Sequence, residues 1–358
     1  MSFEYYIGIM SGTSLDGADA VLCRCSESET QFVAHHYVAY SDKLKWALFQ
    51  LLTPGDNEIE RAGSIEIQLA HVYADLTLAL LAKSGIRSQE VRAIGVHGQT
   101  VRHCPQDGFT VQLNHPALLA ELTGIDVIAD FRSRDMAAGG EGAPLVPAFH
   151  AAMFASSTPR AIVNIGGIAN VTRLADSTVT GFDCGPGNTL LDYWIQKQRD
   201  LPYDKDAQWA KTGKIHKKLL TALLADPYFK RTPPKSTGRE YFNLAWLEKR
   251  YPDLSTVACE DVERTLVSLT AQTIADAVGD IHEIFLCGGG AFNPLLVEEL
   301  RQKGLAVKST SAIGIDPMHV ESMAFAWLAY CFCHKKAGNL PAVTRAQGPR
   351  ILGALYPA

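Results

Sequence analysis

The hydrophobic pattern of the chain predicts strands and helices in alternation. In its first part, short apolar stretches with the length of strands lie at residues 5–9, 20–22, 32–40, 91–96, 110–113 and 126–129. Apolar residues recur at helical spacing over residues 41–52 and 65–83, and the second of these helices stops at Gly85. Strands come first, and helices then alternate with strands. This order indicates an α/β layer architecture.

The second half of the chain shows the same succession of strands followed by alternating helices and strands. Residues 161–172 read as a strand, a glycine turn and a second strand, and residues 178–182 form the strand that pairs next. A further strand is expected at residues 282–286. Long helices are predicted at residues 189–198, 214–226, 259–278, 294–303 and 319–336. Asn188 stands before the first of these helices in the position of an N-cap.

Residues 129–147 are too rich in glycine and proline to form a regular element. They are also too charged at one end for a buried loop without partners, because two arginines and two aspartates lie between positions 130 and 135. The segment is therefore predicted to be a long functional loop at the edge of the first domain.

Glycine-rich turns follow predicted strands at residues 8–19, 164–170 and 286–293. In the first, Gly12 and Gly17 allow close approach of backbone N–H groups to a ligand, and hydroxyls are supplied by Ser11, Thr13 and Ser14. Such a tip suits the oxygens of a polyphosphate, although similar turns are common as purely structural features. It is not a Walker A loop, because no Gly-Lys-Ser/Thr follows and no helix opens there.

The arrangement of the three turns is more informative than any one of them. Two join strands, one in each half of the chain, and together they could grip a polyphosphate in a cleft between two domains. The third leads into a helix, whose first N–H groups favour an anion or a polar ring edge. The sequence therefore predicts nucleotide binding.

Composition narrows the class of protein. The chain has 358 residues, 47% hydrophobic and 20% charged, which is ordinary for a globular protein of two domains. Its formal net charge of -5 does not favour nucleic acid as a partner. The 8 cysteines include no C-x-x-C pair, so reduced thiols and a cytoplasmic location are expected. No signal peptide is evident, and the longest apolar run, residues 323–333, is too short to span a membrane.

Several strings of the chain, in order, resemble those of the anhydro-N-acetylmuramic acid kinase family. They are residues 8–19, 96–100, 129–135, 142–147, 164–170, 181–188 and 287–293. The resemblance runs from residue 7 to about residue 330. Two positions depart from the pattern: Cys184 stands where the family has Thr, and Glu141 where it has Gln. Both flank the expected site, so they bear on substrate contacts more than on the reaction.

The resemblance implies a fold and a reaction. The family is part of the sugar kinase, actin and heat-shock ATPase superfamily, so a two-domain actin-like (ribonuclease H-like) fold with an interdomain ATP cleft is expected. Domain I would comprise residues 1–135, completed by about 340–358, and domain II residues 136–339. The family uses ATP, Mg²⁺ and water to open 1,6-anhydro-N-acetylmuramic acid and phosphorylate its O6, in peptidoglycan recycling. A homodimer is also implied.

The resemblance also suggests which residues bind the nucleotide. Contacts with ATP are expected from Ser11, Gly12, Thr13, Ser14, Asp16, Gly17, Asp19, Gly166, Gly167, Gly185, Gly288, Gly289 and Asn293. Asp16 could position Mg²⁺ through water or simply cap the turn, so the metal ligands stay open. Gly288, Gly289 and Asn293 should lie on the adenosine side.

Asp183 is the expected catalytic base, because it follows a predicted strand and precedes a Gly-Pro-Gly turn. Alternatively, Asp183 could form an Asx-turn or bind magnesium through water. For the lactyl carboxylate of the sugar, Arg132 is favoured over Arg134, since an arginine offers two parallel hydrogen bonds. Either arginine could instead pair with Asp130 or Asp135.

Three more residues are candidate sugar contacts: His97, Gln99 and Glu321. His97 and Gln99 follow a strand end and could bind hydroxyls, although a lone histidine is often only a satisfied core group. Glu321 begins the last long helix, where a negative charge is favourable in any case.

Other readings differ in what they require. An ordinary amino-sugar or hexose kinase on the same fold would deprotonate a sugar hydroxyl and consume no water. A non-catalytic ATP switch would need a peptide-binding domain, for which no segment remains. A dinucleotide-binding enzyme is disfavoured because no G-x-G-x-x-G follows the first strand.

Overall fold

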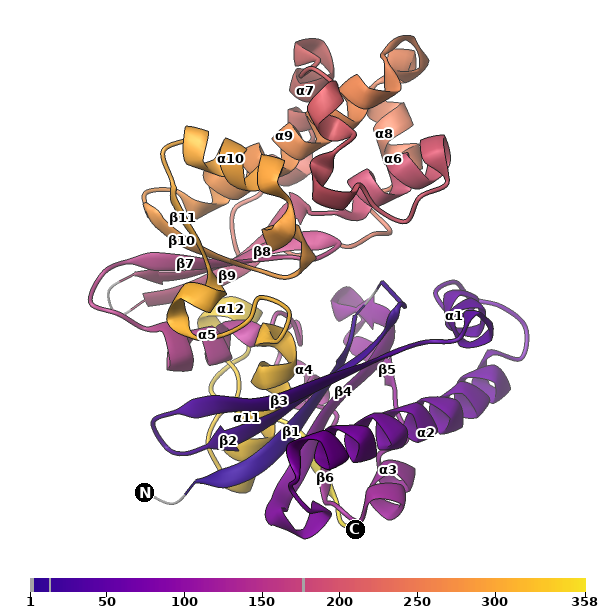
Figure 1. Cartoon of the computed structure of the whole chain (residues 1–358), viewed down its shortest axis with the longest axis vertical. Coiled ribbons are helices and arrows are strands. Elements are labelled where there is room, and N and C mark those ends of the chain that lie inside the picture. The colour runs from indigo at the N-terminus through magenta and orange to yellow at the C-terminus, as the bar shows by residue number, and fades with distance from the viewer. Residues whose placement is uncertain (1–2, 13, 176–177) are drawn as a thin grey trace. The chain divides into compact units, whose positions relative to one another are not determined.

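Figure 1 shows the computed structural model of the chain, which describes residues 3–12, 14–175 and 178–358. The chain divides into two compact units, each of which is described by itself. Unit 1 comprises Met1–Met153 and His319–Ala358, and unit 2 comprises Phe154–Met318. Each unit holds its own sheet with helices, so the predicted α/β class is confirmed.

Unit 1 is built on one mixed sheet. Its strands are β1 (Glu4–Ser11), β2 (Gly17–Cys25), β3 (Thr30–Ala39), β4 (Val91–Cys104), β5 (Phe109–Leu113), β6 (Val127–Ala129) and β12 (Ala354–Tyr356). They are ordered β12-β6-β4-β1-β2-β3, and β5 pairs with β4. The helices are α1 (Asp42–Phe49), α2 (Glu58–Ser84), α3 (Pro116–Thr123), α4 (Ser133–Ala137), α5 (Val146–Phe154), α11 (Val320–Cys333) and α12 (Pro341–Thr344).

Strand β1 is covered on both faces. Ile7 and Ile9 point into the apolar cluster that α2 shares, whereas Gly8 faces α11. A Cβ on Gly8 would lie 1.8 Å from the carbonyl oxygen of Ser322, and one on Gly95 of β4 would lie 2.1 Å from that of Phe325. These two glycines therefore let α11 pack directly on the backbone of the sheet, on the face opposite α2 (Figure 1).

Helix α2 is the one helix among the described residues that has the length and composition to cross a membrane. Its Leu69, Tyr73 and Leu80 are fully buried in the cluster with β1 and β2. That burial is typical of a core helix, because its apolar face is already covered by protein.

Unit 2 carries the second sheet. Its strands are β7 (Arg160–Ile165), β8 (Ile168–Ala175), β9 (Thr178–Pro186), β10 (Glu283–Cys287) and β11 (Ala306–Ser309), ordered β11-β10-β7-β8-β9. Its helices are α6 (Thr189–Arg199), α7 (Lys217–Leu224), α8 (Leu244–Arg250), α9 (Cys259–Val278) and α10 (Pro294–Gln302). Helix α9 lies along this sheet in Figure 1 and contributes Leu266, Ala271 and Ile274 to the core.

Three of the differences between the structure and the sequence prediction lie close to predicted site residues. Strand β4 continues to Cys104 instead of ending at residue 96, because β5 pairs with its second half. Strand β9 continues to Pro186, so Asp183 lies inside it, opposite Asn170 of β8. The glycine- and proline-rich loop contains the short helix α4, whose buried Asp135 is bound by the C-terminal segment described below.

The unit boundaries also lie elsewhere than the sequence predicted. The first part of unit 1 extends to residue 153 instead of 135, and α11 belongs to unit 1 instead of domain II. The physical reason for the second difference is the close packing of α11 on Gly8 and Gly95. The C-terminal strand β12 pairs with β6 of the same unit, with Ala354 opposite Ala129.

We expect Glu263→Gln to stabilise the protein at pH 8. Glu263 in α9 is fully buried, and neither carboxyl oxygen has a hydrogen-bond partner among the described residues. Burial, with Asp204 and Asp192 nearby, raises its pKa from 4.5 to about 9. The folded state thus holds a proton that the unfolded state releases, so stability falls as pH rises from about 4.5 to about 9.

The amide removes this titration. The free energy of unfolding at pH 8 should rise by roughly 1–3 kcal/mol, and its decline from pH 5 to pH 9 should flatten. Denaturant titrations at several pH values measure both effects. Glu60→Gln, at an exposed position of α2, is the control and should leave the pH profile unchanged. An unchanged profile for Glu263→Gln would mean that this carboxyl is already ionised in the fold.

Candidate active site

Ser11, at the end of β1, is an anchor for the first hairpin tip. Its hydroxyl lies 2.9 Å from the Tyr73 hydroxyl of α2 and donates to the carbonyl of Gly98 at 3.1 Å. The side chain is 2% exposed. A contact from Ser11 to a nucleotide would therefore come from its backbone more readily than from its hydroxyl.

A side chain of β4 holds the tip of the first hairpin in place. Gln99 donates from Nε2 to the carbonyl of Gly12 at 3.0 Å, and its side chain is fully buried. Leu15 adopts a φ of 59°, and its N–H donates to the same carbonyl at 3.3 Å. Gln99 thus positions the tip, and its predicted sugar contact stays a prediction. Thr13 lies outside the described residues.

Polar side chains at the tip stay near the surface. Ser14 is exposed and donates to the Asp16 carboxylate at 2.5 Å. Asp16 is itself exposed, and its backbone carbonyl binds the Tyr37 hydroxyl at 3.1 Å. Asp19 instead pairs with His35 of β3 at 2.7 Å. Asp16 is therefore the carboxylate of this hairpin most open to a ligand.

Six of the glycines predicted to contact the nucleotide fall into two groups. Gly17, Gly185 and Gly288 are required by the fold, since a Cβ would lie 2.4–2.7 Å from Val38, Phe229 and Asn164 respectively. By contrast, Gly12, Gly166 and Gly289 would place a Cβ no closer than 3.5, 3.7 and 3.8 Å to the protein. None of the second group has a positive φ. Neither packing nor backbone conformation explains these three, whereas close approach of a ligand does.

The partly buried Arg132 and the buried His97 form a pair that sequence patterns did not reveal. Arg132 donates from Nε and Nη2 to Nε2 of His97 at 3.1 and 2.8 Å, and from Nη1 to the carbonyl of Gly142 at 2.7 Å. Burial and the neighbouring guanidinium hold the pKa of His97 well below its usual value. The imidazole is therefore neutral, and its Nε2 can accept both bonds while Nδ1 carries the proton.

Arg132 keeps its charge in this setting. Burial lowers its pKa to about 10, and the negative charges of Glu321 and Asp135 oppose that effect. Glu321, in the first turn of α11, thus lies within electrostatic reach of Arg132. The structure brings together three of the predicted sugar residues, His97, Arg132 and Glu321, and makes His97 a positioning residue for Arg132.

Asp135 explains how the 129–147 loop is ordered. Fully buried, it accepts hydrogen bonds from the Gly142 N–H at 2.9 Å and from Asn339 Nδ2 and Thr344 Oγ1, each at 2.7 Å. Glu141 pairs with Arg345 at 3.1 Å. The C-terminal segment therefore fixes the loop that carries Arg132, while Arg134 is exposed.

The second hairpin tip, in unit 2, is tied to the start of α6. The N–H groups of Gly187 and Thr189 donate to the carbonyl of Gly167 at 2.9 and 3.0 Å, and that of Asn188 donates to Gly166 at 2.8 Å. Asn188 is the N-cap residue, but its side chain donates to the carbonyl of Ile165 instead of capping the helix. The tip is therefore rigid.

Asp183 is held by the segment that follows α7. Its carboxylate accepts the N–H of Thr237 at 2.9 Å, its own N–H donates to Lys235, and its carbonyl accepts from the Tyr228 hydroxyl at 2.8 Å. The residue is partly exposed. The neighbouring Cys184 points to the opposite face of β9, where it is 2% exposed in the core and burial raises the pKa of its thiol. Its departure from the family pattern therefore affects packing.

In the third turn, residues 286–293, one of the predicted nucleotide contacts has a structural role. Asn293 caps α10, accepting from the N–H groups of Leu295 and Leu296 at 3.1 and 3.0 Å. Gly288 has a φ of 75°, and Gly289 is among the open glycines. A nucleotide contact from Asn293 stays a prediction.

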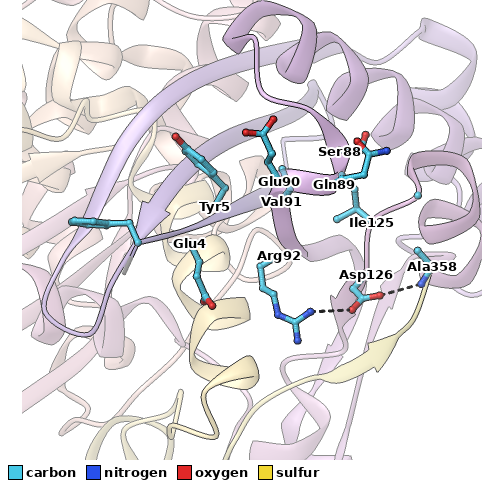
Figure 2. Close-up of a pocket in the computed structure, with 12 residues that line it drawn as sticks. Glu4, Tyr5, Ser88, Gln89, Glu90, Val91, Arg92, Ile125, Asp126 and Ala358 are labelled. Atoms are coloured by element: carbon cyan, nitrogen blue, oxygen red, sulfur yellow. Dashed lines mark hydrogen bonds and ion pairs between the residues drawn. The ribbon is translucent and has the colours of Figure 1, made fainter. Parts of the chain in front are cut away.

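Figure 2 shows a surface pocket that is distinct from these residues. It is lined by the starts of β1 and β4 and by Asp126, which pairs with Arg92 and with the N–H of Ala358. The predicted site residues of unit 1 lie instead at the carboxyl end of β1, beside the middle of β4, in the loop after β6 and in the first turn of α11. Ligands of open α/β sheets bind beyond the carboxyl ends of parallel strands such as β1, so the candidate site is the one described above.

The family model and the curated relatives that match this chain carry one description. The chain matches the family described as anhydro-N-acetylmuramic acid kinase over residues 4–358. A relative of that description from Burkholderia cenocepacia is 50% identical, with 98% of this chain and 96% of the relative covered. One from Pseudomonas putida is 49% identical, with 99% of each covered. Among solved structures, the activator of the 2-hydroxyisocaproyl-CoA dehydratase from Clostridium difficile with bound ADPNP has a TM-score of 0.46 at 12% identity, covering 92% of this chain and 96% of that one.

Proposed function

The chain belongs to the anhydro-N-acetylmuramic acid kinase family, and on that premise we propose how its residues perform the reaction. The family predicted from the sequence is confirmed. The protein is a kinase of this amino sugar and acts in cell-wall recycling, with ATP as the phosphoryl donor. The observation that carries the detailed proposal is Asp183, a partly exposed carboxylate fixed at the second hairpin by the N–H of Thr237.

The proposed reaction forms two bonds and breaks two. A water oxygen bonds to C1 of the sugar as the bond from C1 to O6 breaks, and O6 takes that electron pair. O6 then bonds to the γ-phosphorus of ATP as the bridging bond to ADP breaks. Asp183 accepts the proton of the water. The hydrogen bond from Thr237 orients the carboxylate, as a general base requires.

Arg132 is proposed to bind the lactyl carboxylate of the sugar. Its three hydrogen bonds, to His97 and Gly142, use three of the five N–H donors of a guanidinium and fix the plane of the group. An oriented guanidinium can pair with a carboxylate through two parallel bonds. Glu321 is proposed as a neighbouring contact to the sugar hydroxyls.

The open glycines are proposed as nucleotide contacts, Gly12 in unit 1 and Gly166 and Gly289 in unit 2, because a phosphate or ribose oxygen can approach their backbones. Mg²⁺ is commonly held by one or two carboxylates together with phosphate oxygens and water. The exposed carboxylate of Asp16 fits such a partial ligand set and would hold the ion, which neutralises phosphate charge when bound. A cytoplasmic homodimer is part of the same proposal, and light scattering in solution tests the dimer.

The test of this function uses labelled water. The protein is incubated with ATP, Mg²⁺ and 1,6-anhydro-N-acetylmuramic acid in ¹⁸O-water, and the product is weighed by mass spectrometry. A phosphorylated sugar with one label on carbon supports hydrolytic ring opening coupled to phosphoryl transfer. An unlabelled phosphosugar would indicate an ordinary sugar kinase, and nucleotide binding without any phosphosugar would indicate an ATP switch.

We expect Gly12→Ala to weaken ATP binding without weakening the fold. The methyl group meets the protein no closer than 3.5 Å, yet it would occupy the space proposed for a phosphate. The KM for ATP should rise about tenfold, the equivalent of about 1.4 kcal/mol of lost contact. Steady-state kinetics measures this effect.

The matched control for this change is Gly63→Ala in α2, where a Cβ would meet no atom within 4 Å. It should raise stability by about 0.5–1 kcal/mol, as alanine does in a helix, and leave the KM for ATP unchanged. Equal KM values for Gly12→Ala and the wild type would argue against a phosphate at this tip.

A further inference from the structure

Unsatisfied hydrogen-bonding groups gather around the second hairpin tip. Among the described residues, no partner is present for the Nε of Arg239 or for the hydroxyls of Thr189 and Thr237, although all three are buried atoms. Thr189 is only 1% exposed. Such groups are costly to bury without a partner, and each one in a native fold calls for a ligand or another explanation.

Two of these groups meet at Gly167. A Cβ on Gly167 would lie 2.7 Å from the Thr189 hydroxyl and 2.9 Å from both Nε and Nη2 of Arg239. Glycine therefore makes room for a hydroxyl and a guanidinium at the same point of the tip. The preceding residue, Gly166, is one of the open glycines, at which a Cβ would lie no closer than 3.7 Å to the protein. The local chemistry is that of an anion site, with donors and a positive charge around partly exposed backbone.

Arg239 is not a loose surface arginine. Its segment is clamped at both ends by the buried Asp226, which accepts from the Tyr228 N–H, the Tyr241 hydroxyl and Trp246 Nε1, each at 2.8 Å. Arg250 also pairs with this carboxylate. The segment is thus fixed to the core of unit 2 on either side of Arg239, and little conformational entropy remains to be lost when the arginine binds a ligand.

The same segment also holds Asp183. Thr237, two residues before Arg239, donates its N–H to the Asp183 carboxylate at 2.9 Å. The residue proposed as the base and the unpaired guanidinium are therefore positioned by one short stretch of chain. No salt bridge of Arg239 is present among the described residues, so its charge has no protein counterion there.

We infer that Arg239 and the Thr189 hydroxyl bind the terminal phosphoryl group of ATP and stabilise it during transfer to the sugar. This inference rests on the proposed function and adds two catalytic residues to it. Charge on the transferring phosphoryl group is spread over its outer oxygens, which a planar guanidinium and a hydroxyl can contact together. Arg239 thereby offsets the negative charge of the third phosphate of ATP. ADP lacks that phosphate, so its binding should not depend on Arg239.

The test compares nucleotides that differ by one phosphate. Calorimetry gives the Kd of ADP and of AMPPNP for the wild type, Arg239→Ala, Arg239→Lys and Thr189→Val. For Arg239→Ala we expect the Kd of ADP to stay within about twofold, that of AMPPNP to rise about tenfold, and kcat to fall about 10²–10³-fold. Arg239→Lys should recover part of kcat, because it keeps the charge but loses the planar fork.

Two further variants separate a catalytic role from a structural one. Arg231→Ala removes the same charge from the same segment at an exposed position, and kcat should be unchanged. Thr189→Val removes a buried hydroxyl that has no partner among the described residues, so the thermal midpoint should not fall while kcat falls about tenfold. Added guanidinium should raise the kcat of Arg239→Ala.

Other results would overturn the inference. Equal loss of ADP and AMPPNP affinity would make Arg239 a general structural support. A raised KM for the sugar with unchanged AMPPNP affinity would place the lactyl carboxylate at Arg239 instead. A wild type that makes no labelled phosphosugar fails the proposed function itself, whereas a fully active Arg239→Ala fails only this inference.

Discussion

Asp183→Asn is expected to lower kcat for phosphosugar formation by about 10³-fold, within the range that a positioned general base contributes. Asparagine has nearly the same shape, and its side-chain oxygen can still accept the N–H of Thr237, which is 2.9 Å from the carboxylate. What it cannot do is take the proton of the attacking water. The loss should therefore appear in kcat, with the Kd of ADP unchanged.

The measurement is phosphosugar formation by mass spectrometry, together with calorimetry for ADP. Asp253→Asn is the matched control, an exposed aspartate of the same unit, and its kcat should equal that of the wild type. Thermal midpoints of both variants verify folding. If Asp183→Asn kept more than a tenth of the wild-type kcat, the base would have to be another group.

Arg132→Ala is expected to raise the KM for the sugar by about 10–200-fold, the equivalent of the 1.5–3 kcal/mol of a hydrogen bond to a charged group. The KM for ATP should change little. The variant should also lose its preference for a sugar that carries the lactyl group over 1,6-anhydro-N-acetylglucosamine, which lacks it. This second readout is specific to the carboxylate, since a merely unfolded loop would lower activity on both sugars.

Arg134→Ala is the matched control, because Arg134 is the exposed neighbour two positions away on the same loop. It should bind both sugars as the wild type does. His97→Asn should give a smaller rise in KM, because it loosens Arg132 without removing the charge. A normal KM in Arg132→Ala would mean that the lactyl group binds elsewhere.

Much of the local architecture follows from sequence patterns. The first hairpin, the third strand and helices α6, α9 and α10 lie within a few residues of their predicted ranges, because period and glycine turns are local properties. The extension of β4 to Cys104 depends on its pairing with β5, and that of β9 to Pro186 on its pairing with β8. Pairing with a neighbouring strand sets where these two strands end. The spacing of apolar residues along one strand does not reveal that pairing.

Some features of the candidate site could likewise be predicted from the sequence, and others could not. Glycine turns and the polar residues beside them could be found from sequence, since tight approach to a ligand requires small residues at particular points. The open group, Gly12, Gly166 and Gly289, could not be told from Gly17 and Gly288, because contacts with distant side chains distinguish them. Arg239 had no local signal beyond a polar stretch.

Local patterns in the chain were enough to predict most of the strands and helices, the glycine turns, the family and the carboxylate proposed as the base. Contacts between distant segments were needed to see that His97 orients Arg132, that Gln99 supports Gly12, that α11 joins unit 1 and that Arg239 lies against Gly167. Asp135 and its partner Asn339 are 204 positions apart. Period and turn chemistry act over a few residues, whereas such contacts form only when the whole chain has folded.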